Sequence, residues 1–309
     1  MGKWSQQQVS RVTRDAQRLA LNAAAMRVEH FVADSLNLST ADRVTLLDPT
    51  GKALIVAELT SRRESLLFID GSIPRYVLYS DAAGTDQICG FTEYLSQHVT
   101  DKRMVSRFEH YADVIKYLRK MKTGHDLEAV AAAILDELLS VGTATSGSGD
   151  QGVDAIGWSS LVNIDSACVD GFVKAVGDNR EMKVFAVVSS KQFRYPDSGP
   201  PTTISPAFIR ELIGGWLIQR SSHSAWQSSG LKLLSPIQLV LATTYRLSPD
   251  SRLLCDSLGV HVWSVPQLVY LICAVAPDSV FDSTSGHRFD GWGFRRWWQN
   301  YHDHRLAAQ

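Results

Sequence analysis

The sequence lacks several features that would assign it to a large class of proteins. No apolar run approaches the roughly 20 residues that cross a bilayer, and the N-terminal stretch has no apolar signal core before a small-residue cleavage site. No phosphate-loop motif of ATP-driven motors is present. No CxxC pair exists among the four cysteines, which are Cys89, Cys168, Cys255 and Cys273. We therefore expect a cytosolic protein with free thiols and no zinc ribbon.

The chain also has almost no net charge. Its 31 Lys and Arg residues face 32 Asp and Glu residues, for a formal charge of −1. Any contact with nucleic acid must then come from a local basic patch. With 309 residues, 45% hydrophobic and 20% charged, the chain has the composition of an ordinary folded protein and the length of two domains.

The first part, about residues 1–122, is predicted to be a small α+β domain for targeting, sensing or partner binding. Helical spacing of apolar residues predicts one long helix over residues 5–36. Strand-like sequence on both sides of Pro49-Thr50-Gly51 predicts a hairpin. The remaining elements expected here are strands at Leu66–Ile69 and Tyr76–Tyr79 and a basic amphipathic helix at Arg103–Met121.

Residues 123–276 alternate between helical and strand patterns, which predicts an α/β domain with a sheet flanked by helices. A helix capped by Asp126 is expected to end near Gly142 and to lead into a loop at Thr143–Gly152. The strands expected after it are Val153–Trp158, Val184–Ser190, Ile237–Thr244 and Val260–Trp263, and the helices are Pro206–Gln219, Pro249–Leu258 and Pro266–Ala274. Residues 277–309 are expected to form an aromatic and basic C-terminal tail.

Three residues of this α/β half carry the chemistry that we single out. Asp154 stands in the strand after a Gly-rich loop, and Lys191 ends the apolar strand VFAVVSSK. Strand alternation places Ser189 and Lys191 on one face, and Glu128 lies beside the apolar stripe of its helix. Carboxylate oxygens hold Mg²⁺, which activates water and neutralises phosphate charge, and a lysine can orient that water. Phosphodiester hydrolysis needs this set.

The order of these residues resembles the Mrr-like restriction endonuclease domain of the PD-(D/E)XK nuclease superfamily, over about residues 124–275. The matching elements are Glu128 early in the first helix, the turn Gly149-Asp150-Gln151-Gly152-Val153-Asp154, the strand end Ser189-Ser190-Lys191, and Thr243-Thr244 at the end of a later strand. The resemblance implies a restriction-endonuclease-like mixed sheet flanked by helices. It also implies a Mg²⁺-dependent DNA endonuclease in prokaryotic defence, with Mn²⁺ able to substitute.

The same resemblance implies the roles of single residues. Asp154, the carbonyl of Ser190 and Glu128 would hold the metal, and Lys191 would position or activate water. Ser189 departs from the family pattern, which has Glu or Gln at this position. A serine has a shorter reach, so it would act through water or leave the metal more weakly held, and Asp150 is a candidate to compensate.

Each feature also has an ordinary structural explanation when it is taken alone. Asp154 would be a turn acid, Glu128 a first-turn acid favoured by the helix dipole, and Lys191 a charge on an edge strand. The C-terminal aromatic and basic residues suit base stacking and phosphate contact, but we favour a helix docked by its tryptophans. The order of all the elements together favours the nuclease.

Two other functions stay open at this stage. The domain would be a catalytically degenerate module for DNA binding or assembly if Ser189 marks a lost ligand, or a nuclease acting on RNA. The superfamily further implies a homodimer or a partner subunit. DNA is the expected partner, and no membrane is expected.

Overall fold

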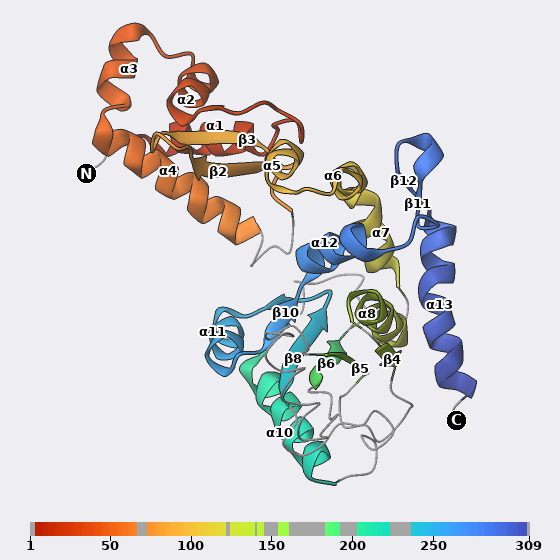
Figure 1. The fold of residues 1–309 in the computed structure, drawn as a ribbon. Coiled ribbons are helices and arrows are strands. Elements are labelled where there is room, and N and C mark those ends of the chain that lie inside the picture. Colours follow the sequence, from red (N-terminus) through yellow and green to blue (C-terminus); the bar gives the residue numbers. More distant parts are fainter. Residues whose placement is uncertain are drawn as a thin grey trace, which may run out of the picture. The chain divides into compact units, whose positions relative to one another are not determined.

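The computed structural model describes residues 4–66, 73–121, 124–139, 141–144, 154–160, 183–191, 203–222 and 236–307. It forms two compact units, Met1–His110 and Tyr111–Gln309 (Figure 1). The expected boundary after residue 122 differs from this division, because α7 (Tyr111–Lys120) packs against α12 (Val265–Val275) of the second unit. None of the described helices is long and apolar enough to cross a membrane.

The first unit is built on a three-stranded antiparallel sheet with the order β1 (Met26–Arg27), β3 (Asp86–Gly90), β2 (Tyr76–Ser80). Its helices are α1 (Gln6–Ala16), α2 (Val28–Leu36), α3 (Thr40–Leu46), α4 (Pro49–Glu64), α5 (Phe91–His98) and α6 (Lys102–Phe108). The expected α+β character and the strand at Tyr76–Tyr79 are confirmed. The expected strand at Leu66–Ile69 lies mostly outside the described residues.

The single long helix expected over residues 5–36 is wrong. The segment is divided into α1, a connection, the short strand β1 and α2. Backbone contacts with a distant part of the chain hold the connection, because Gly90 N–H donates to Ala23 O and Thr92 N–H donates to Leu21 O, both at 2.9 Å. A Cβ on Gly90 would lie 2.2 Å from the carbonyl oxygen of Leu21, so the two segments approach as closely as a glycine allows.

The hairpin expected around Pro49-Thr50-Gly51 is also wrong. Pro49 begins α4, and the side chain of Asp48 caps the helix by accepting from Gly51 N–H at 2.8 Å. Proline is well suited to a first helical turn, where its missing N–H would have no helical partner. The basic helix expected at Arg103–Met121 is interrupted at residues 109–110, and only its second part, α7, belongs to the second unit.

The second unit contains a five-stranded mixed sheet. Its order is β10 (His261–Trp263), β8 (Ile237–Thr243), β6 (Lys183–Lys191), β5 (Ala155–Ser160) and β4 (Val141–Ala144). The first three strands are parallel, and β5 and β4 each run antiparallel to their preceding neighbour. A mixed sheet was expected and is confirmed. The loop expected over Thr143–Gly152 is wrong at its start, because Thr143 and Ala144 belong to β4, and the rest of that segment lies outside the described residues.

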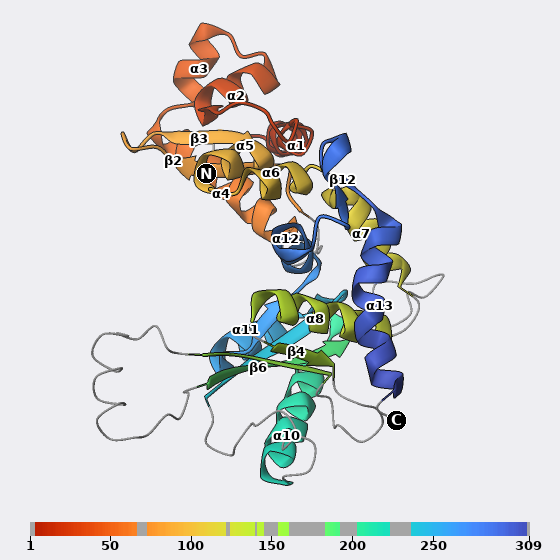
Figure 2. The ribbon, with the colours of Figure 1, turned by 45° about the vertical axis from the view of Figure 1, so that its right-hand side comes forward.

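Helices cover both faces of this sheet (Figure 2). On one face, α8 (Gly124–Leu138) packs Ala132 and Leu135 against Val188. On the other face, Trp216 of α10 (Pro206–Ser222) packs against Phe185 and its neighbours. The helix α8 ends at Leu138, so Gly142 does not terminate it as expected.

The second unit also contains further helices and two separate pairs of short strands. They are α11 (Pro249–Leu258), α13 (Gly291–Ala307), the parallel pair β7 (Thr203–Ile204) and β9 (Arg246–Leu247), and the antiparallel pair β11 (Phe281–Asp282) and β12 (Arg288–Phe289) around a short 3-10 helix, η3 (Ser283–Ser285). The expected helices α10, α11 and α12 are confirmed. Tyr301 Oη of α13 donates to Asp136 Oδ2 of α8 at 2.6 Å. The segment from residue 277 onward, which was expected to be a tail, is therefore part of the second unit.

Candidate active site at the edge of the mixed sheet

Asp154 lies directly before β5 and is 8% exposed. Its N–H donates to Val188 O at 2.9 Å, which continues the ladder between β5 and β6 by one residue. Its carboxylate oxygen Oδ2 accepts from Ser190 N–H at 2.5 Å. A hydrogen bond from a backbone amide to a carboxylate is charge-assisted, so it fixes the orientation of the Asp154 side chain. The structure therefore joins two of the predicted site residues directly.

The end of β6 carries two consecutive buried serines. Ser189 and Ser190 are 6% and 7% exposed. Strand alternation places Ser190 on the same face as Val188, which α8 covers, and Ser189 on the opposite face with Val187. The backbone of Lys191 pairs in parallel register with Thr243, while its side chain lies outside the described part of the structure.

The direction of α8 brings Glu128 to the same edge. β4 runs along β5 from the level of Trp158 to the level of Ala155. Because α8 ends only shortly before β4 begins, the helix runs in the opposite direction to β4 over the sheet, and its first turns lie at the Ala155 end. Glu128 stands in these first turns, toward the edge where Asp154 precedes β5.

Glu128 is 8% exposed, which is unusual for a carboxylate. Its Oε2 accepts a hydrogen bond of 2.9 Å from Nδ1 of His125, one turn earlier on α8. The sequence interpretation did not include His125. Its spacing of three residues from Glu128 is the signal that would have found it, because such pairs face each other on a helix.

Buried polar side chains are concentrated in this region. Of the nine buried polar or charged residues among those described, six belong to it: Glu128, Asp154, Ser189, Ser190, Thr243 and Thr244. The hydroxyl oxygens of Ser190 and Thr244 are buried and meet no hydrogen-bond partner within the described part of the chain. Burying a hydroxyl without a partner costs free energy, on the order of 1–3 kcal/mol. A polar ligand or ordered water at this edge would remove that cost.

These residues provide oxygen donors suited to a hard cation. The two carboxylates and the nearby hydroxyl and carbonyl oxygens match the ligand preference of Mg²⁺, which also retains several waters. No group of three or more His, Cys, Asp or Glu side chains that would hold a metal occurs among the described residues. Asp150, the further acid considered above, lies outside them, as does most of the Gly149–Asp154 turn.

The aromatic C-terminal residues are mainly structural. Phe294, Trp297 and Trp298 are 0%, 7% and 8% exposed, as expected for a docked helix. Trp292 differs, because 74% of its surface is exposed.

Comparison with known proteins gives two structural likenesses. The DNA modification-dependent restriction endonuclease AspBHI aligns at 12% identity over 76% of this chain and 60% of its own, with a TM-score of 0.35. The restriction endonuclease MspJI, in complex with a 27-mer oligonucleotide, aligns at 15% identity over 57% of this chain and 34% of its own, also with a TM-score of 0.35. The chain thus spans less than two thirds of either protein.

No protein-family model matches the sequence, and no curated protein does. Likenesses at this TM-score carry no argument about activity. The resemblance to the Mrr-like domain stays a prediction.

Proposed function

We propose that the second unit is a Mg²⁺-dependent endonuclease that hydrolyses DNA phosphodiester bonds, with a role in prokaryotic restriction or anti-phage defence. The observation that carries the proposal is the group of buried polar residues at the carboxyl ends of β6 and β8, where Asp154 is bonded to Ser190. The carboxyl ends of parallel strands are a common place for ligand sites in α/β sheets. The defence role comes from the sequence resemblance alone.

Asp154, the carbonyl of Ser190 and Glu128 are the groups that would hold the metal. A bound Mg²⁺ or Mn²⁺ lowers the pKa of a coordinated water and neutralises charge on the phosphate. The amide of Ser190 holds the Asp154 carboxylate in one orientation, and His125 does the same for Glu128. Such supporting hydrogen bonds pre-organise a site before substrate arrives.

Lys191 is assigned the role of orienting water or stabilising the charge that develops on the phosphate. Its backbone position at the end of β6, beside Thr243, supports this assignment. Ser189 stands two residues earlier, where the Mrr-like domains that the sequence resembles have Glu or Gln. With no carboxylate there, metal affinity depends more strongly on Asp154 and Glu128.

The alternative is a nuclease fold that binds DNA or assembles with other subunits without cutting. The presence of Ser189 and the lack of a third acid among the described residues favour it. DNA is the proposed partner in both cases, with a homodimer or a partner subunit as the assembly.

A plasmid assay separates these possibilities. Supercoiled DNA is incubated with the full chain in Mg²⁺, in Mn²⁺ or with a chelator, and a parallel binding assay measures retention of the same DNA. Cutting that requires the metal supports the endonuclease. Binding without cutting in either metal supports the non-catalytic module, and preferential cutting of RNA in a mixed sample would reassign the substrate.

A further inference from the structure

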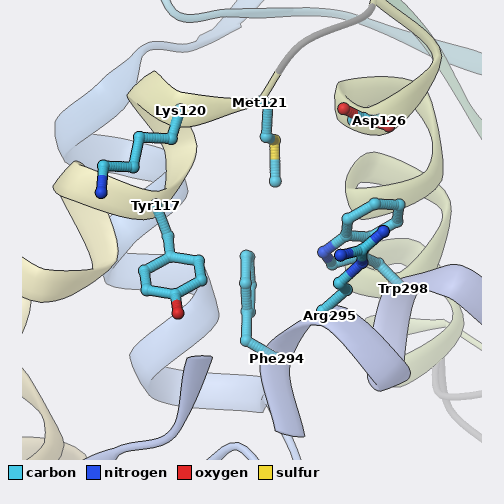
Figure 3. Close-up of a pocket in the computed structure, with 7 residues that line it drawn as sticks. All are labelled: Tyr117, Lys120, Met121, Asp126, Phe294, Arg295 and Trp298. Atoms are coloured by element: carbon cyan, nitrogen blue, oxygen red, sulfur yellow. The ribbon is translucent and has the colours of Figure 1, made fainter. Parts of the chain in front are cut away.

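A second polar and aromatic site lies on the outer side of α8. A pocket of about 450 Å³ is formed by α7, the start of α8 and α13, all within the second unit (Figure 3). Pockets of roughly 300–1,000 Å³ suit small molecules. No residue proposed for phosphodiester hydrolysis lines this pocket.

The aromatic part of the pocket is held in place by packing. Phe294 and Trp298 are almost completely buried and form its floor, while Tyr117 is 39% exposed and presents its ring. Tyr117 packs edge-on against Phe294, with ring centroids 6.4 Å apart and an interplanar angle of 84°. A Cβ on Gly291 would lie 1.9 Å from the Tyr117 hydroxyl, so the ring lies directly on the start of α13. The aromatic surface is therefore fixed before any ligand binds.

The charged part of the pocket favours an anion. Lys120 and Arg295 line it and are exposed to solvent. The structure gives neither cation an ion pair with a described residue. Arg295, Trp298 and Asp126 line one side of the pocket, while Lys120 and Tyr117 line the other (Figure 3). Two cations and one carboxylate leave the pocket with a net positive charge, and a cation on each side of an aromatic surface favours a planar ring that carries a negative group.

We propose that this pocket binds a mononucleotide. The base stacks on Tyr117, the phosphate meets Arg295 across the pocket, Lys120 adds positive charge on the Tyr117 side, and Asp126 accepts hydrogen bonds from the sugar hydroxyls. Stacking between a base and an aromatic side chain contributes about 1–3 kcal/mol, and a guanidinium binds phosphate through paired hydrogen bonds. Each part of a nucleotide thus has a matching group in the pocket.

The pocket is separate from the sheet edge but shares a helix with it. Asp126 and Glu128 are two residues apart on α8, so about 200° of rotation places them on opposite sides of the helix. A bound nucleotide would contact the first turn of α8, whose inner side carries Glu128. Through this shared helix the nucleotide would regulate DNA cleavage. That regulation rests on the proposed function, whereas the binding of the nucleotide does not.

Calorimetric titration of the full chain tests the binding. The ligands are AMP, GMP, CMP and UMP, with adenosine and inorganic phosphate as the two separate halves. We expect a dissociation constant below about 1 mM for at least one nucleotide and weaker binding of both halves. Arg295→Gln and Lys120→Gln should each weaken binding by about tenfold, while Arg296→Gln, an exposed neighbour outside the pocket, should not change it.

Three results would overturn the proposal. The first is the lack of measurable binding of any nucleotide, and the second is equal binding by wild type, Arg295→Gln and Lys120→Gln. The third is loss of binding in Asp154→Asn with full binding in Arg295→Gln, which would place the nucleotide at the sheet edge. Retained binding in Asp154→Asn supports the pocket whether or not the protein cuts DNA.

Discussion

Tyr76 shows how one buried residue affects the stability of the first unit. Its side chain is fully buried, and its hydroxyl donates to Leu59 O at 2.8 Å. Burial raises the pKa of Tyr76 to about 12, although the nearby Arg63 and Arg62 act in the opposite direction. In the unfolded chain the same hydroxyl ionises near pH 10, its ordinary pKa, so the folded state keeps a proton that the unfolded state has already lost.

This difference predicts a loss of stability at high pH. The contribution of Tyr76 is fully present below about pH 10 and disappears as pH rises to about 12, a change of roughly 2–3 kcal/mol in the free energy of unfolding. Tyr76→Phe should cost about 1 kcal/mol at neutral pH through the lost hydrogen bond. Between about pH 10 and pH 12, the Tyr76→Phe variant should lose less stability than wild type. Urea unfolding at several pH values measures both effects, and parallel curves for the two proteins would contradict the account.

Burial also raises the pKa of the Cys89 and Cys255 thiols to about 11. Both side chains are almost completely inaccessible. We therefore expect neither thiol to react with iodoacetamide in the native protein at neutral pH, because the thiolate is the reactive form. Mass spectrometry of the labelled protein checks this, with urea-unfolded protein as the control, and rapid native labelling of either cysteine would be inconsistent with the packing.

At the level of secondary structure elements, two glycines in helices give opposite predictions. Gly51 lies in the first turn of α4, where a Cβ would be 2.0 Å from the carbonyl oxygen of Leu46. Gly214 lies within α10, and among the described residues a Cβ there would meet no atom within 4 Å beyond the adjacent residues and the backbone of its own helix. Alanine is the better helix former by about 1 kcal/mol, so only the steric surroundings distinguish the two positions.

Gly51→Ala should lower the free energy of unfolding by about 2 kcal/mol, because the backbone of Leu46 must move. Gly214→Ala should raise it by about 0.5–1 kcal/mol. Chemical denaturation of both variants measures the difference. Equal effects of the two substitutions would show that helix propensity alone decides, against the close approach at Gly51.

The elements of the second unit were largely predictable, since their signals are local. Ser248 and Pro249 mark the start of α11, and Gly259, with φ of 68°, marks its end. The first unit was less predictable, because β1 exists through its pairing with Ile88 and Gln87 far along the chain. No Gly or Pro in residues 17–25 announces the break before it.

The candidate site was predictable only in part, because its motifs are local whereas the contacts between them are not. Glu128, Asp154 and Ser189–Lys191 followed from motif order along the chain. The contact of Asp154 with Ser190 N–H depends on the register of β5 against β6, which no local pattern specifies. The pocket beside Tyr117 joins α7 to α13 across the chain, so aromatic composition alone did not reveal it.

At the scale of the whole molecule, each unit has its own hydrophobic core. The core of the first includes Ile55, Leu59 and Ile88, and those of the second lie on the two faces of the mixed sheet. Units with separate cores can unfold separately. We expect Leu59→Ala, which removes a fully buried side chain, to cost about 2–5 kcal/mol in the first unit only.

Differential scanning calorimetry tests this expectation. Leu59→Ala should shift one transition to lower temperature, and Leu135→Ala, in the core beneath α8, should shift another. A single transition that both variants move equally would show one cooperative unit and contradict the division at His110 and Tyr111.

The central claim is that the buried polar residues at the sheet edge cleave DNA, and single-turnover plasmid cleavage in Mg²⁺ tests it most directly. Asp154→Asn and Glu128→Gln are compared with wild type and with two exposed acids, Asp250→Asn on α11 and Glu137→Gln at the other end of α8. We predict that both site variants lose about 100-fold or more in rate, while both controls keep the wild-type rate and all five proteins unfold cooperatively. Cleavage by Asp154→Asn at the wild-type rate would contradict the account.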